Sequence, residues 1–141
     1  MLIYVDTSVL VALCTHEAKT AAVAQWYSAC TQDLASAAWC VTEFASALAL
    51  KQRTGQLTSA QANSAWLRFE RVCANDVQLL PVDASTFHKA ALLTMDAASG
   101  LRAGDALHLA CAMQAKAQGM ATLDAVLAKA AHRHKIQPVV I

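Results

Sequence analysis

The chain has few glycines, prolines, aromatic residues and charges. Its 141 residues include 4 Gly and 2 Pro, 6% are aromatic and 15% are charged. No linker, low-complexity tract or repeat divides the sequence, so we expect residues 1–141 to form a single domain with its own core. The net charge of +1, without a basic tail or an acidic block, argues against strong nonspecific nucleic-acid binding by charge alone.

Targeting and membrane signals are also missing. No run of about 18 uninterrupted apolar residues is present, which excludes a membrane span. The N-terminus has no positive segment and turns polar at Asp6, which excludes a secretory signal peptide. The cysteines are odd in number, contain no Cys-x-x-Cys pair and fall mostly within helical patterns, so we expect core thiols in a reducing cytoplasm. They are Cys14, Cys30, Cys40, Cys73 and Cys111.

Short apolar runs alternate with helical patterns along the chain. The runs predict strands at 2–5, 34–37, 77–81, 120–123 and 138–141. The helical patterns predict helices at 7–13, 18–30, 38–53, 58–73, 84–98, 105–117 and 125–133. The alternation indicates an α/β fold with a mainly parallel central sheet flanked by helices. The hydrophobic content of 57% exceeds that of a typical soluble domain, and much of the excess is alanine. We expect some apolar surface to remain for a partner.

Four acidic residues stand beside apolar segments in this weakly charged chain. Asp6 and Asp124 each follow a predicted strand, Asp105 opens a helix, and Glu43 interrupts one. Carboxylates at the edge of a core are costly unless they are paired or bound to a metal. Ligands of open α/β sheets bind beyond the carboxyl ends of the strands, which is where this pattern places Asp6 and Asp124. The four acids together predict a cation site and chemistry on phosphates.

Each acid also has a simpler interpretation. Asp6 and Asp124 are suitable N-caps for the helices that follow them, and Asp105 suits the positive end of a helix dipole. Glu43 has no cation three or four residues away, which argues against a solvated ion pair on its helix. The hypothesis of a metal site therefore depends on the four acids as a set.

Carboxylate oxygens favour hard divalent ions such as Mg²⁺ and Mn²⁺, and no Cys/His set with zinc spacing competes. We expect Asp6, Asp105 and Asp124 to bind the metal, and Glu43 to bind through water or to accept a proton from the nucleophile. Thr7 and Ser8 are expected to orient a ligand carboxylate by hydrogen bonding. A bound ion would activate water for attack on a phosphodiester.

The segments around the acids resemble a known family. They are Val5-Asp6-Thr7-Ser8-Val9-Leu10, Thr42-Glu43-Phe44, the stretch from Leu101 to Ala110, and Ala121-Thr122-Leu123-Asp124. In this order they are similar to the PIN domain, and more narrowly to the VapC-type toxins. The resemblance implies a PIN-like α/β/α sandwich and an Mg²⁺- or Mn²⁺-dependent endoribonuclease of a type II toxin–antitoxin system. It further implies a homodimer neutralised by a small antitoxin protein. Ala125 stands where some relatives carry a further acid.

Two other functions are considered. A catalytically weak PIN-like binding module would act through dimer and antitoxin contacts alone. A different phosphoryl-transfer enzyme fits poorly, because a haloacid-dehalogenase-type phosphatase needs an acid where Ser8 stands. A receiver domain needs a second acid beside Asp6, and Tyr4-Val5-Asp6 offers none.

Several polar side chains keep two interpretations. His108 is favoured as a hydrogen-bonded core histidine over a metal ligand paired with Asp105. Arg102 contacts RNA phosphate or offsets the acids. The cations near the C-terminus complement a helix end or contact an RNA backbone; they are Lys129, His132, Arg133, His134 and Lys135. The tryptophans are expected in the core or an interface; they are Trp26, Trp39 and Trp66.

Overall fold

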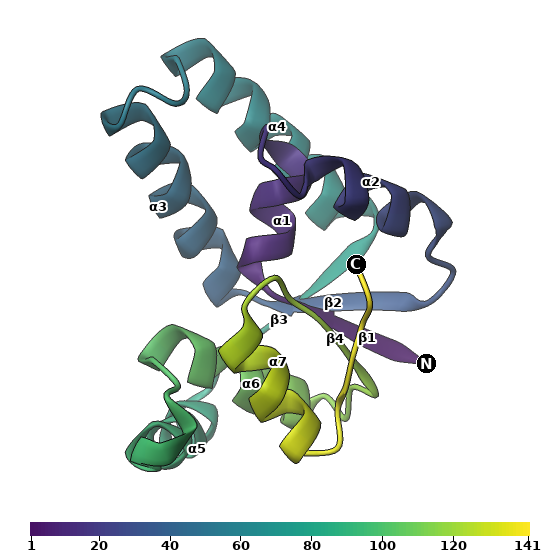
Figure 1. Cartoon of the computed structure of the whole chain (residues 1–141), viewed down its shortest axis with the longest axis vertical. Coiled ribbons are helices and arrows are strands. Elements are labelled where there is room, and N and C mark those ends of the chain that lie inside the picture. The colour runs from purple at the N-terminus through teal and green to yellow at the C-terminus, as the bar shows by residue number, and fades with distance from the viewer.

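The computed structural model describes residues 1–141 and is built on a parallel sheet of five strands (Figure 1). The strand order is β3-β2-β1-β4-β5, and every neighbouring pair is parallel. The strands are β1 (Leu2–Val5), β2 (Asp33–Ala37), β3 (Val77–Leu80), β4 (Gly119–Ala121) and β5 (Gln137–Pro138). The central strands are apolar and buried because helices cover both faces of the sheet.

Helices form a layer on each side of this sheet (Figure 1). One layer contains α1 (Thr7–Cys14), α2 (Thr20–Ala29), α3 (Trp39–Arg53) and α4 (Ser59–Asn75). The other contains α5 (Ala84–Met95), the short 3₁₀ helix Ala97–Ser99, α6 (Ala103–Gln114) and α7 (Ala125–Arg133). Each layer has its own cluster of buried apolar side chains. The expected α/β/α sandwich is confirmed. No helix combines the length and the apolar character needed to cross a membrane.

Capping explains where several helices begin. The side chains of Asp6, Asp83 and Asp124 accept hydrogen bonds from the first turns of α1, α5 and α7. Thr58 and Gln61 form a capping box at the start of α4. These local bonds satisfy backbone N–H groups that a helix start leaves without partners. Two of the caps, Asp6 and Asp124, are also members of the acidic set.

The α3–α4 hairpin packs through aromatic side chains. The rings of Phe44 and Phe69 stack with centroids 4.2 Å apart, and Trp66 lies 5.4 Å from Phe69. Trp26 and Trp66 pack against the first cluster and Trp39 against the second. Leu67, by contrast, is 59% exposed because it lies on the outer side of α4.

Several predicted boundaries were wrong. The last strand covers only Gln137–Pro138, and Val140 is 94% exposed, because β5 lies at the open edge of the sheet. The helix expected over 84–98 ends at Met95 and is followed by a separate 3₁₀ turn. The helix expected over 105–117 runs from Ala103 to Gln114, so Asp105 lies within its first turn.

Candidate active site

Asp6 lies at the carboxyl end of β1 and is 4% exposed. Its Oδ1 accepts hydrogen bonds from Ser8 Oγ at 2.6 Å and from the Val9 backbone N–H at 3.4 Å. Its Oδ2 accepts one from Thr122 Oγ1 at 2.7 Å. Burial raises the pKa of Asp6 above its ordinary value, although the bonds from Ser8 and Thr122 and the nearby His108 oppose the rise.

Asp124 reaches the same edge of the sheet, because β4 pairs with β1. Thr122 joins the two acids: its hydroxyl donates to Asp6 and accepts from the Asp124 backbone N–H at 3.0 Å. Ser8 Oγ accepts from the Leu123 backbone N–H, also at 3.0 Å. The chain therefore leaves the sheet after Ala121, two residues before the predicted end of the strand, in order to make these contacts.

Asp105 sits in the first turn of α6 and faces the other acids. Burial raises the pKa of Asp105 first, and the negative charges of Asp124, Asp6 and Glu43 raise it further, while His108 lowers it. No salt bridge reaches Asp6, Asp105 or Asp124. These three carboxylates are thus neighbours without a cationic side chain bound to them.

Glu43 is the one acid of the set that has a positive partner. His108 Nε2 forms a hydrogen-bonded ion pair with Glu43 Oε1, and Thr7 Oγ1 donates to the same oxygen at 2.6 Å. Burial alone would raise the pKa of Glu43, but the bond and charge of His108 and the bond from Thr7 outweigh it and lower the pKa. Burial would lower the pKa of His108, yet Glu43 and Asp6 raise it.

His108 is buried, with 2% exposure, and both ring nitrogens are occupied. Nδ1 lies 2.7 Å from Tyr4 Oη, and the Ala37 backbone N–H donates to the same phenol oxygen at 2.9 Å. The favoured interpretation of His108 as a hydrogen-bonded core histidine is confirmed. Because both ring nitrogens have partners, the structure favours this interpretation over a metal ligand paired with Asp105.

The predicted common metal centre is not formed by the side chains as they stand. No group of three His, Cys, Asp or Glu residues is arranged so that it could hold a metal ion. Asp6 and Asp124 direct oxygens to helix caps and hydroxyls, and Glu43 directs Oε1 to His108. The donor set nevertheless fits a hard divalent ion, because it consists of carboxylate oxygens whose mutual repulsion a cation would relieve. Metal binding by the four acids stays a prediction.

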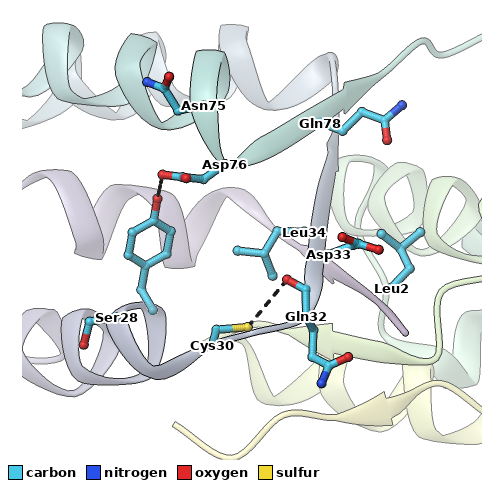
Figure 2. A pocket seen from close by; sticks show the side chains of 10 residues that line it. Leu2, Ser28, Cys30, Gln32, Asp33, Leu34, Asn75, Asp76 and Gln78 are labelled. Carbon is cyan, nitrogen blue, oxygen red and sulfur yellow. Dashed lines mark hydrogen bonds between the residues drawn. The ribbon is translucent and has the colours of Figure 1, made fainter.

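The largest of the well-formed hollows lies elsewhere (Figure 2). It has a volume of about 690 Å³ and is lined by the amino ends of β1 and β2 and by residues near the end of α4, including Leu2, Asp33 and Asp76. Tyr27 donates a hydrogen bond to Asp76 at its wall. This is the edge of the sheet opposite the acids, so its size does not make it the candidate active site.

Comparison with known families gives a match over nearly the whole chain. The model of the PIN domain matches residues 3–136. The chain belongs to the PIN-domain family. Comparison with curated proteins finds no match.

Solved structures share the fold of this PIN-domain chain. VapC20 of Mycobacterium tuberculosis, described as a toxin that cleaves the sarcin–ricin loop, is 18% identical with a TM-score of 0.73, covering 91% of this chain and 94% of its own. FitAcB of Neisseria gonorrhoeae is 22% identical with a TM-score of 0.70, covering 98% and 96%. VapBC2 of Rickettsia felis, solved with a DNA fragment from its promoter, is 11% identical with a TM-score of 0.64, covering 99% and 98%.

Sequence reasoning missed four residues of this PIN-domain site. Tyr4, Thr122, Gly104 and Trp39 contribute contacts or space around the acids. Thr122 carried a usable signal, because it stands two residues before Asp124 at the end of an apolar run. Tyr4 carried none, since a tyrosine in a buried strand is an ordinary core residue.

Replacing Asp105 with Asn is expected to stabilise the protein in the absence of divalent cations. Because the folded-state pKa of Asp105 is raised, the stability that its neutral form provides is lost as pH rises through that pKa. Asparagine has no such loss. The melting temperature at pH 7 should rise by on the order of a few degrees, and the gain should shrink as pH falls towards 4. Thermal melts at several pH values in a chelating buffer measure this. An Asp105→Asn protein that melts below the wild type at pH 7 contradicts the crowding of these charges.

Proposed function

We propose that this PIN-domain chain is a metal-dependent endoribonuclease and the toxin of a type II toxin–antitoxin pair. The observation that carries the proposal is the set of neighbouring acids at the carboxyl edge of the sheet, of which only Glu43 has a positive partner. VapC20, which shares the fold, is described as a toxin that cleaves the sarcin–ricin loop, and this supports RNA as the substrate class. We take residues 1–141 to be a single PIN-like domain.

In this proposal Asp6, Asp105 and Asp124 bind Mg²⁺ or Mn²⁺. Glu43 binds the metal through water or accepts a proton from the nucleophile. The metal would supply an activated water and neutralise charge on the phosphoryl group. Ser8 and Thr122 orient Asp6 by donating to its two oxygens, and Thr7 orients Glu43. The runner-up is a PIN-like module without useful catalysis. Such a module would not require these acids.

The partners follow from the same family. We propose a homodimer that a small antitoxin protein neutralises, consistent with exposed apolar side chains such as Leu92 and Met95. We place the protein in the cytoplasm, which suits its five free cysteines.

Divalent metal should stabilise the folded protein. An ion that binds the folded state alone adds stability by mass action, about 2.7 kcal/mol at 100 times its Kd. We therefore expect millimolar Mg²⁺ or Mn²⁺ to raise the melting temperature of the wild type, and to raise that of Asp105→Asn much less. Differential scanning fluorimetry with and without chelator measures both shifts. Equal shifts in the two proteins would place the metal elsewhere.

Replacing Asp6 with Asn should abolish RNA cleavage without unfolding the protein. Asparagine can still cap α1, but it carries no charge for a metal. Asp33 offers a matched control, since it is an exposed aspartate at the opposite edge of the sheet. We expect RNA ends mapped after induction in cells to appear with wild type and Asp33→Asn and to vanish with Asp6→Asn. Persistent cleavage by Asp6→Asn would contradict the assignment, and no cleavage by the wild type would favour the binding module.

The cations of α7 offer a path for the RNA backbone away from the acids. Lys129, His132 and Arg133 are exposed, form no salt bridge and line a hollow of about 410 Å³ with Pro138. The helix begins at the residue after Asp124, so Lys129 and Arg133 stand roughly 6 and 12 Å along it at 1.5 Å per residue. Arg102, also exposed and unpaired, precedes α6 at the acidic edge. We therefore favour phosphate contact over a purely helix-capping role.

The salt dependence of RNA binding tests this path. In the Asp6→Asn background, the double variant Lys129→Gln/Arg133→Gln should flatten the slope of log K against log salt by roughly 1.4, or about 0.7 per lost phosphate contact. Lys19→Gln/Arg53→Gln removes the same charge from two other exposed positions and should leave the slope nearly unchanged. Equal slopes for both double variants would contradict the path.

A further inference from the structure

The carboxylate of Glu43 has one oxygen held by two donors, while the other accepts no geometrically formed hydrogen bond and has only the indole N–H of Trp39 nearby. Oε1 accepts from Thr7 Oγ1 at 2.6 Å and from His108 Nε2. An ionised carboxylate cannot donate a hydrogen bond, so Nε2 of His108 carries the proton. Thr7 has a single hydroxyl proton, which goes to Glu43, and its oxygen then faces the same Nε2–H at 3.2 Å.

Tyr4 holds the imidazole of His108 through its other ring nitrogen, Nδ1. The phenol oxygen accepts the Ala37 backbone N–H at 2.9 Å and lies 2.7 Å from His108 Nδ1. Nε2 carries a proton whether the ring is charged or neutral: Tyr4 accepts from Nδ1 in the first case and donates to it in the second. Tyr4 and His108 are 0% and 2% exposed. The imidazole therefore has one orientation, held at both nitrogens inside the core.

Gly104 leaves space beside the other oxygen. A Cβ added at Gly104 would stand 3.0 Å from Glu43 Oε2 and 3.6 Å from Trp39 Nε1, a buried N–H without a hydrogen-bond partner. The backbone of Gly104 has no positive φ, so its conformation does not call for glycine. The requirement at this position is space next to Oε2.

We propose that His108 is a positioning residue: backed by Tyr4 and assisted by Thr7, it fixes Glu43 so that only Oε2, above Gly104, is open to an incoming group. The inference rests on the nuclease function proposed above, because it assigns the working oxygen of Glu43 in that site. It separates the roles of two residues on one helix, since Asp105 faces the acids while His108 holds Glu43 from the core.

Gly104→Ala tests whether His108 and Thr7 hold the Glu43 carboxylate in place. A methyl group at 3.0 Å requires its neighbour to give way by a few tenths of an ångström. A free glutamate end would swing aside easily, whereas one fixed by His108 and Thr7 would resist. The substitution should therefore lower the melting temperature when His108 is present, and have little effect, or raise it through better helix propensity, when the hold is removed.

The experiment is a double-mutant cycle between Gly104→Ala and His108→Leu, measured by thermal melts without metal and by calorimetric titration of Mn²⁺. His108→Gln keeps an N–H donor for Glu43 and should behave like the wild type. In the wild-type background Gly104→Ala should lower the melting temperature and weaken Mn²⁺ binding about tenfold or more. In the His108→Leu background the loss of melting temperature should disappear. Ala103→Ser, on the exposed neighbour of Gly104, should add independently in both backgrounds.

Thr7→Val replaces His108→Leu in the cycle if that variant does not fold, since it removes the other donor to Oε1. Additive melting shifts in a protein that binds Mn²⁺ overturn the hold on Glu43. The melting shifts in the cycle could be non-additive while the wild type neither binds Mn²⁺ nor cleaves RNA. That result would support the positioning of Glu43 by His108 and contradict the nuclease function. The two failures are therefore distinguishable.

Discussion

Crowded negative charge at one edge of the sheet is the constraint on which the site depends. Asp6 is almost fully buried, Asp105 is half-buried, and neither is paired with a cationic side chain. Their raised pKa values express the cost of keeping both ionised at neutral pH. A bound divalent cation would offset this unfavourable free energy, which is why the electrostatics of the chain favour metal binding at this edge.

 The sheet topology brings these charges together. β1 and β4 are neighbours although 116 positions separate Tyr4 from its register partner Met120. The register also joins Val5 to Ala121, so the carboxyl ends of β1 and β4 lie side by side. Asp6 and Asp124 follow those paired ends, and the hydroxyls of Ser8 and Thr122 cross between the two segments. Parallel pairing therefore places two acids at one edge, and the hydroxyls set their orientation.

Much of this arrangement could be predicted from the sequence, because strand ends and N-caps are local signals. Asp6 and Asp124 were placed from the apolar runs before them. The partner of Glu43 could not be found in this way, since His108 lies 65 positions away and only residues three or four apart were compared. The space beside Gly104 could not be predicted from the sequence either, because it depends on how α3 and α6 approach each other. The predicted strand at 138–141 was wrong because an apolar run at a sheet edge resembles a buried strand.

The two kinds of acid in the site have different physical roles. Glu43 is stabilised as a carboxylate by His108 and Thr7, and it needs no metal to remain ionised. Asp6 and Asp105 are destabilised as carboxylates, and they gain most from a cation. This division assigns metal attraction to the aspartates and a fixed acceptor oxygen to the glutamate.

The most direct test of the metal site is anomalous diffraction from a crystal of the protein soaked in Mn²⁺. We predict a manganese peak with carboxylate oxygens of at least two of Asp6, Asp105 and Asp124 about 2.0–2.3 Å away, after rotation of side chains that now cap helices. A peak only at other residues, or none at saturating Mn²⁺, would contradict it.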